Sequence, residues 1–512
     1  MTARALDASL EAPVSATRRA LIVLSVMTCA TLVILDVSLV TVTLPRMQGS
    51  FSATQDQISW MVTSFIIGTT VAGACVGWFA DKFGRKRLFL VSAAGFTLGY
   101  VLAGSATELA PAVEWRTLQG AFGAPLLPLS QAICLDAYPK RLHGRVNAVW
   151  GVFIMIGPIL APVFGGYLTE AYSWRWAMFA MVPLGALGFL GVLAFVPESL
   201  RQPERALDWL GFTTLIVAVG ASQFVLNRGE RLDWFDSTEV LLAAGLALLC
   251  LYLFVVQCFT ARRPFVEVRM FGDWNASTGL LLGLLWGLML NGIVVLLSLL
   301  MQNLRGYPAV TIGLLLAPRG AGMILGMILA ERIMAVMDHR HVLVLASLSM
   351  AGTGWFMAQW TPEVGAAHVA WAAALQGFSA GVSWVPLATL TFSTIARRYR
   401  TEALVIFHLL IQMGSSTGIA AGVNILTRSS NASHATLTEH VTPFNELFHA
   451  PAVAQHWDLG SQRGLAAIEG EITRQSEMIG HLSNFQYLAL LALAIIPLAY
   501  LFRRAPPERR GE

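Results

Sequence analysis

Charge is what this chain of 512 residues lacks most, because only 12% of its residues are Asp, Glu, Lys or Arg. Soluble domains carry about 25% charged residues. Lysine is the scarcest of the four, with three copies at Lys82, Lys86 and Lys140. Together with a hydrophobic share of 56%, this composition excludes an ordinary soluble domain.

Signatures of enzyme chemistry are missing too. No lysine follows a glycine, so there is no Walker A loop, and there is no HExxH and no GxGxxG after a strand. No CxxC occurs among the cysteines, Cys29, Cys75, Cys134, Cys250 and Cys258. We therefore expect no enzyme activity, no metal, no cofactor and no nucleic-acid partner. Any uphill transport must draw on an ion gradient.

Apolar runs long enough to cross a bilayer recur along the whole chain. They predict an all-α polytopic membrane protein with fourteen transmembrane helices, at residues 20–44, 58–80, 88–107, 112–136, 146–168, 175–196, 208–227, 238–260, 276–301, 311–335, 341–360, 366–393, 403–427 and 484–502. The predicted domains are a cytoplasmic tail 1–19, a six-helix bundle 20–196, two inserted helices 208–260, a second six-helix bundle 276–502 and a tail 503–512.

The distribution of Lys and Arg predicts the orientation. With the N-terminus inside, and with Arg332 and Arg175 at the ends of spans counted with the adjoining inner and outer segments, 24 of the 34 fall in inner segments, 8 in outer segments and 2 well within spans. Cytoplasmic loops carry such an excess, so both termini are predicted to be cytoplasmic. The densest basic cluster is the hinge 77–87 between spans two and three, where Gly84 suits a tight turn and Asp81 can pair with Arg85.

A short motif recurs in the two halves. Trp115 to Gly120 opens span four with a Leu-Gln-Gly triplet, and Trp371 to Gly377 opens span twelve with the same triplet. A triplet alone arises easily by chance, but its matched place in both halves favours an internal repeat. Two related halves with a site between them are a common transporter plan.

The charged residues of most interest within the spans of the first half are Asp36 in span one and Arg116 in span four. A charge at membrane depth costs at least a few kcal/mol, which favours a functional role with a partner. Low-dielectric surroundings favour the protonated form of a carboxyl group, so Asp36 can load and release a proton. Arg116 stays charged and can serve as its counter-charge or hold a substrate. The structural alternatives are a satisfied pair for Asp36 and a helix-bridging hydrogen bonder for Arg116.

Other polar residues in the spans are candidate pathway residues: Gln119, Asn291, Arg319 and His408. For Arg319 a contact with lipid headgroups is an equal alternative, and a lone His or Asn is more often a link between helices. Span five is dense in small residues and prolines, at Gly157, Pro158, Pro162, Gly165 and Gly166. Such a helix suits a pivoting element, with ordinary close packing as the alternative.

The last outer segment, 428–482, is far longer than the others. Leu465, Ile468, Ile472 and Ile479 recur in it at helical spacing and predict a surface amphipathic helix. Such a segment can act as a lid over the outer mouth or as a docking surface for a partner.

Taken together, these motifs resemble the major facilitator superfamily, and within it the fourteen-span drug:proton antiporters of the EmrB and QacA type. The matching segments, in chain order, are 35–45, 77–87, 116–120, 157–166 with 174–176, 228–235 and 437–445. The chain departs from the antiporter pattern at Ala161, where glycine is usual, and at Gln412, where relatives often carry arginine.

This resemblance implies proton-coupled efflux of hydrophobic or amphipathic compounds by alternating access, with Asp36 as the protonation site and Arg116 as its partner. It implies a cytoplasmic gate built from Gly77, Asp81, Gly84, Arg85 and Lys86. It also implies a Gram-negative inner membrane, a periplasmic adaptor and an outer-membrane channel. The alternative functions are an importer or uniporter for a defined solute and a non-transporting receptor.

Overall fold

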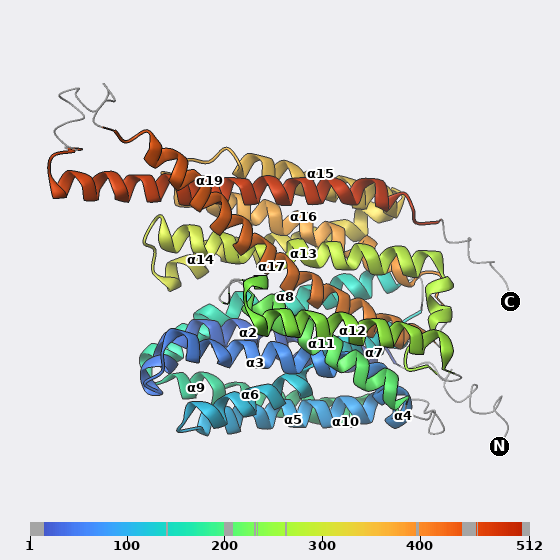
Figure 1. Ribbon diagram of the computed structural model, residues 1–512. Coiled ribbons are helices and arrows are strands. Elements are labelled where there is room, and N and C mark those ends of the chain that lie inside the picture. Colours follow the sequence, from blue (N-terminus) through green and yellow to red (C-terminus); the bar gives the residue numbers. More distant parts are fainter. Residues whose placement is uncertain are drawn as a thin grey trace, which may run out of the picture. The chain divides into compact units, whose positions relative to one another are not determined.

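The structure, a computed structural model, describes residues 15–139, 142–198, 208–229, 232, 234–261, 264–395, 399–442, 457 and 459–503 (Figure 1). In these ranges every regular element is a helix, and each of the fourteen predicted spans coincides with a helix or a bent pair of helices. Within the described residues, ten helices are long and apolar enough to cross a membrane, or up to eleven if a pair bent by 55° counts as one span. The predicted all-α polytopic fold is confirmed.

The helices of the first half are α2 (Ala16–Ser50), α3 (Gln55–Gly73), α4 (Val76–Phe83), α5 (Arg85–Ser105), α6 (Leu109–Gly123), α7 (Leu126–Ala137), α8 (His143–Ala171), α9 (Trp174–Phe179), α10 (Met181–Phe195) and α11 (Trp209–Arg228). Those that follow are α12 (Thr238–Thr260), α13 (Trp274–Asn303), α14 (Ala309–Met334), α15 (His339–Met357), α16 (Ala366–Phe392), α17 (Arg400–Glu439) and α19 (Gln462–Ala499), with short 3₁₀ turns at Trp234–Asp236 and Val268–Gly272.

Local signals fix several helix boundaries. The Thr54 hydroxyl accepts from the Gln57 backbone N–H while the Gln57 side chain accepts from the Thr54 N–H, a capping box that starts α3. Gly84 ends α4 and precedes α5 with a φ of +88°, which only glycine adopts at low cost. The predicted tight turn at Gly84 is therefore confirmed.

The chain forms two compact units. Unit 1 comprises residues 1–220, 246–273 and 394–409, and unit 2 comprises 221–245, 274–393 and 410–512. In unit 1, α3 packs on α6 so closely that a Cβ on Gly68 would meet the Thr117 carbonyl and one on Gly120 would meet the Phe65 carbonyl. Small residues permit this approach of two backbones.

Unit 2 repeats this contact with its own helices. There α14 packs on α16, a Cβ on Gly322 would meet the Ala374 carbonyl, and one on Gly377 would meet the Arg319 carbonyl. Gly377 follows Gln376 as Gly120 follows Gln119, so the repeated sequence motif makes the same helix contact in each unit. Position 319 of unit 2 consequently corresponds to Phe65 of unit 1.

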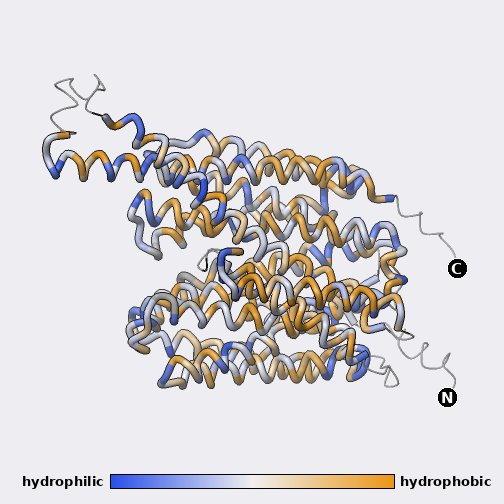
Figure 2. The backbone as a smooth tube through the Cα atoms, in the orientation of Figure 1, coloured by the Kyte–Doolittle hydropathy of each residue, from blue (hydrophilic) through white to orange (hydrophobic). Residues whose placement is uncertain are grey.

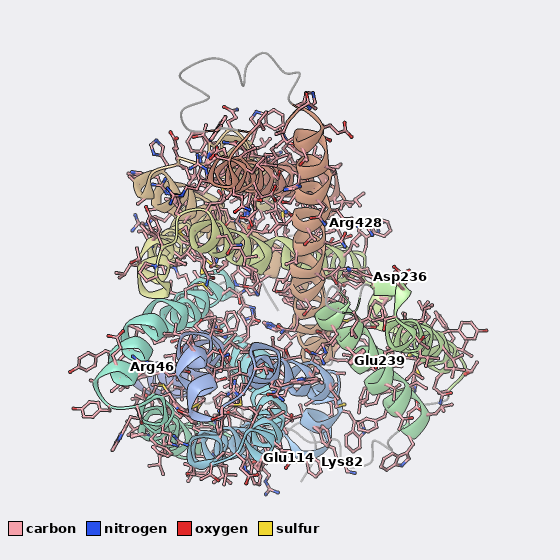
Figure 3. The ribbon with its side chains drawn as sticks, turned by 60° about the vertical axis from the view of Figure 1, so that its left-hand side comes forward. Arg46, Lys82, Glu114, Asp236, Glu239 and Arg428 are labelled. Atoms are coloured by element: carbon pink, nitrogen blue, oxygen red, sulfur yellow. The ribbon has the colours of Figure 1, made fainter. Side chains whose placement is uncertain are left out.

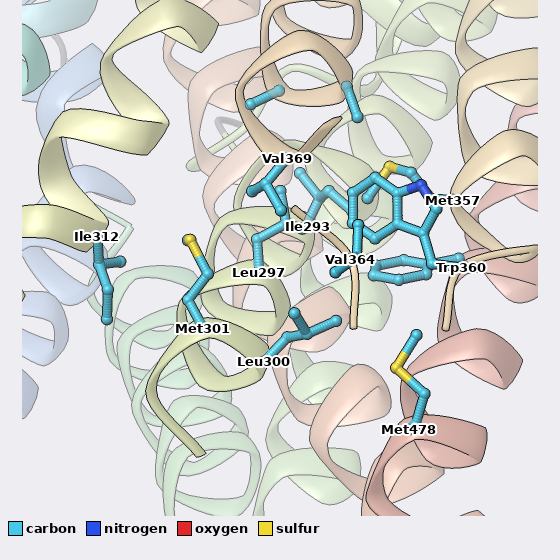
Figure 4. Packing of buried hydrophobic residues seen from close by; sticks show 13 residues of the cluster. Ile293, Leu297, Leu300, Met301, Ile312, Met357, Trp360, Val364, Val369 and Met478 are labelled. Carbon is cyan, nitrogen blue, oxygen red and sulfur yellow. The ribbon is translucent and has the colours of Figure 1, made fainter. Parts of the chain in front are cut away.

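A buried hydrophobic cluster joins α13, α15, α16 and α19 of unit 2 (Figure 4). It includes Leu297, Leu300, Met357 and Phe485, each with no exposed surface. Along the helices hydrophobic positions predominate, and hydrophilic ones gather near helix ends (Figure 2). Long apolar side chains on α12, such as Leu242 and Leu248, are about 70% exposed, as a lipid-facing surface requires.

Helices α17 and α19 contain 40 and 38 residues. At about 1.5 Å per residue, each is nearly twice as long as the hydrocarbon layer is thick. Figure 1 shows both extending beyond the other helices of unit 2, and they remain paired there through Ser429 with Ser483 at 2.9 Å and His434 with Glu469 at 3.0 Å. The expected helix over 465–479 is present, and it continues without a break into the last span.

Candidate functional site

A buried ion pair joins α2 to α6 within unit 1. Arg116 Nη1 donates to Asp36 Oδ1 at 2.9 Å, and Nη2 lies 2.8 Å from Asp36 Oδ2. Neither residue has any exposed surface. Both carboxylate oxygens therefore lie within contact distance of the guanidinium. The structure thus brings together the two predicted proton-coupling residues.

Neutral groups complete the surroundings of the Arg116 guanidinium. Its Nε donates to the Met61 carbonyl of α3 at 3.1 Å, and Nη1 also donates to Gln119 Oε1 at 2.7 Å. The cation lies 4.5 Å from the centroid of the Phe65 ring, within cation–π range. Arg116 therefore links three helices, α2, α3 and α6, through one side chain.

Tyr100 of α5 is fully buried beside this pair, and both Asp36 and Arg116 act electrostatically on its hydroxyl. The hydroxyl donates to the Leu32 carbonyl of α2 at 3.2 Å. Sequence reasoning missed Tyr100 and Phe65. A tyrosine in the middle of the apolar third span is the signal that could have drawn attention to the first, whereas nothing distinguishes Phe65 from other aromatic residues in the spans.

The predicted antiporter helix packs against α2 at Thr31, Leu35 and Leu39, next to Asp36 in the sequence. A Cβ on Gly157 would lie 2.9 Å from the Leu35 nitrogen, and one on Gly165 would lie 2.7 Å from Leu39 Cδ1. Gly166 faces open space by the same measure. Both prolines predicted for this helix, Pro158 and Pro162, fall within α8, and their side chains lie outside the described part of the structure.

The predicted gate residues lie at the turn between α4 and α5. Arg85 forms an ion pair with Asp136 at the end of α7, and Lys86 donates to the Leu193 carbonyl at 3.0 Å. The Asp136 partner was not predicted. Asp81 belongs to the last turn of α4, two residues before its end at Phe83.

Gly77 lies directly against the start of α17. A Cβ added to it would lie 3.7 Å from the Glu402 Cα, and Glu402 is itself buried with its carboxylate accepting from the Glu267 N–H at 2.9 Å. The structure therefore places Gly77 beside the start of the predicted thirteenth span.

The remaining pathway candidates fall at three separate places. His408 Nε2 lies 2.8 Å from Gln131 Oε1 in unit 1, within a buried polar group. In unit 2, Asn291 donates to the Ser415 hydroxyl at 2.7 Å. Arg319 donates to two neutral acceptors, the Gln376 side chain and the Leu290 carbonyl. Of the four predicted pathway residues, only Gln119 joins the buried ion pair.

Several other charged residues lie on the exposed surface. Glu114, two positions before Arg116 on α6, is exposed, as are Arg46, Glu239 and Arg428 (Figure 3). Within the described ranges, no three His, Cys, Asp or Glu side chains come together as a metal ion would require.

Known proteins identify the family. The family model described as Major Facilitator Superfamily matches residues 26–420. The chain belongs to this superfamily. Curated relatives include the multidrug export protein EmrB of Haemophilus influenzae, 30% identical over 90% of this chain and 91% of the relative, and EmrB of Escherichia coli, 29% identical over 93% and 94%. The fatty acid resistance protein FarB of Neisseria gonorrhoeae is 28% identical over 93% and 94%.

Solved structures of the superfamily share the fold. The human organic anion transporter MFSD10 aligns with a TM-score of 0.63 at 14% identity, covering 95% of this chain and 99% of that one. The proton:xylose symporter XylE aligns with a TM-score of 0.57 at 15% identity, covering 96% and 100%. This facilitator-superfamily chain is thus a multi-pass membrane transporter of the EmrB type and not an enzyme.

Proposed function

We propose that the chain is a proton-coupled efflux transporter that exports hydrophobic or amphipathic compounds by alternating access. The observation that carries this proposal is the Asp36–Arg116 ion pair, which is buried between α2 and α6. Export is the activity printed for the EmrB relatives, and fatty acid resistance is that of FarB. Drugs and lipophilic acids are therefore the first cargo classes to test.

The pair can couple a proton to a movement of helices. Protonation of Asp36 removes its negative charge and leaves Arg116 held only by Gln119, the Met61 carbonyl and the Phe65 ring. The link between α2 and α6 then weakens, while the link between α3 and α6 remains. Because Asp36 has no contact with water here, proton exchange belongs to another conformation, as alternating access demands.

In this account two six-helix bundles, 20–196 and 276–502, change conformation during each transport cycle. Gly157 and Gly165 of α8 let this helix pivot on α2, and the turn at Gly84, with Asp81, Arg85 and Lys86, latches the cytoplasmic side. The transporter lies in a bacterial inner membrane with both termini in the cytoplasm.

The paired extensions of α17 and α19 support a partner on the outer side. Their length beyond the bilayer and their mutual contacts fit a rigid projection that docks a periplasmic adaptor, which in turn joins an outer-membrane channel. A lid over the outer mouth is the alternative role for the same projection.

Reconstitution into vesicles tests the function. Purified protein in proteoliposomes is given a pH gradient, and transport is screened with cationic, neutral and acidic lipophilic dyes. We expect transport of at least one class that stops when an ionophore collapses the gradient. An equal rate after collapse would contradict proton coupling, and net movement of dye along with the protons would favour an importer.

A further inference from the structure

Arg319 of α14 is a partly buried cation without a counter-charge. Its Nε donates to Gln376 Oε1 of α16 at 2.9 Å, and its Nη2 donates to the Leu290 carbonyl of α13 at 2.7 Å. Both acceptors are neutral. Neither α13 nor α16 contains a single Asp or Glu, and the only acid of α14 is Glu331, three turns further along. Among the described residues, no carboxylate contacts Arg319.

Unit 1 shows what such a site looks like when it is complete. There Arg116 bonds to Gln119, the counterpart of Gln376, and to the Asp36 carboxylate. In unit 2 the cation lies on a different helix of the repeat. Ala373 of α16 occupies the place of Arg116, and Arg319 of α14 occupies the place of Phe65. Each guanidinium donates to the glutamine at the same position of the repeat. Arg116 reaches Gln119 from the same helix, and Arg319 reaches Gln376 from the neighbouring helix.

The acid has no counterpart in unit 2. The contact of α8 with α2 in unit 1 has a counterpart in unit 2, where α17 packs on α13. A Cβ on Gly157 would meet the Leu35 nitrogen, and one on Gly414 would meet the Leu288 nitrogen, so Leu35 and Leu288 correspond. Asp36 therefore corresponds to Met289. Unit 2 therefore has a partly buried guanidinium bonded to the glutamine of the repeat but no anion beside it, and a charge removed from water is costly unless it is paired.

Arg319 also has a donor to spare. Its Nη1 bonds to nothing among the described residues, and the side chain keeps some exposed surface, unlike that of Arg116. One turn before it, Leu315 and Leu316 are partly buried hydrophobic residues packed on the apolar cluster of this unit. A guanidinium with a free donor beside an apolar wall matches a carboxylate attached to an apolar tail.

We propose that Arg319 binds the anionic headgroup of an amphipathic substrate, a carboxylate or a similar single oxyanion, in place of the acid that unit 2 lacks. This inference rests on the proposed export function and names one of its substrate classes. The substrate anion completes in unit 2 the ion pair that Asp36 completes in unit 1. Arg319 and Gln376 then decide headgroup preference, while Asp36 carries the proton.

Binding of matched probes tests the site without any gradient. Octanoate, octanol and octyltrimethylammonium share one tail and differ only in headgroup. By calorimetric titration of the detergent-solubilised protein, we expect octanoate to bind at least about tenfold more tightly than octanol. Arg319→Gln should reduce octanoate affinity to within about threefold of octanol and leave octanol unchanged, because only the carboxylate loses its charged partner.

Controls separate recognition from a structural role. Arg428→Gln removes one exposed positive charge from the same unit and should keep the preference for octanoate. Arg319→Lys keeps the charge and should retain a weaker preference, which keeps the test decisive if the Gln variant fails to fold. Equal loss of all three probes, or unchanged octanoate binding in Arg319→Gln, would overturn the inference. Wild-type protein that binds octanoate but fails the gradient assay would overturn the export function alone.

Discussion

At the scale of single residues, the geometry of Arg116 explains why this position requires an arginine. One guanidinium reaches Asp36 on α2, the Met61 carbonyl on α3 and Gln119 on its own helix at the same time. The planar guanidinium has five N–H donors and can bond to all three acceptors, whereas the ammonium of lysine is a compact point charge that cannot reach all three from one position.

We therefore expect Arg116→Lys to insert and fold but to lose at least about tenfold in gradient-driven transport, since each 1.4 kcal/mol of lost interaction is about a factor of ten. Initial rates in proteoliposomes, normalised to the amount of inserted protein, measure this. Glu114→Gln changes an exposed charge on the same helix and serves as the control. Wild-type rates in the Lys variant would show that the geometry of the guanidinium is irrelevant.

At the scale of helices, the contact of α8 with α2 depends on one missing side chain. A Cβ at Gly157 would lie 2.9 Å from the Leu35 nitrogen and 3.1 Å from the Thr31 oxygen, and both are backbone atoms that cannot swing aside. The added carbon would separate the helices immediately next to Asp36.

Gly157→Ala should accordingly reduce transport several-fold or more, whereas Gly166→Ala, nine residues further along the same helix, should leave it nearly unchanged. Gly166 has no atom within 4 Å of an added Cβ. Because both changes raise helix propensity by similar amounts, the pair isolates the contact itself. The two variants would be compared by transport rate and melting temperature, and equal behaviour would contradict a special role for the α8–α2 contact.

The projection formed by α17 and α19 gives a second expectation at this scale. Replacing residues 433–474 by a short flexible linker keeps the contacts nearer the membrane, such as Ser429 with Ser483. If the projection docks an adaptor, the shortened protein should transport normally in vesicles but confer no resistance in cells that depend on the adaptor. Loss of transport in vesicles as well would favour the lid.

At the scale of the whole molecule, sequence reasoning reached the fold because the signals that decide it are local. Run length predicted fourteen spans, and a helix or a pair of consecutive helices occupies each. It failed for the extent of α17 and α19, because hydropathy ends where the polar residues begin while the helix continues through them.

The candidate site was predictable only in part. Asp36 and Arg116 stand out as charges in apolar runs, but they are 80 positions apart, and their pairing depends on how α2, α3 and α6 pack. The lone cation Arg319 was visible as well, yet its missing partner becomes apparent only when Gly120 and Gly377 align the two units. Contacts between helices, and not any single residue, carry this information.

The most direct test of the account is proton release on substrate binding, measured with purified protein in weakly buffered detergent solution. The dye transported fastest in vesicles is added, and the pH change is calibrated against added acid. The account predicts release of up to about one proton per wild-type protein, since binding of proton and substrate are reciprocally linked, and none from a folded Asp36→Asn variant that still binds the dye. Equal proton release from both proteins would contradict the assignment of Asp36 as the proton carrier.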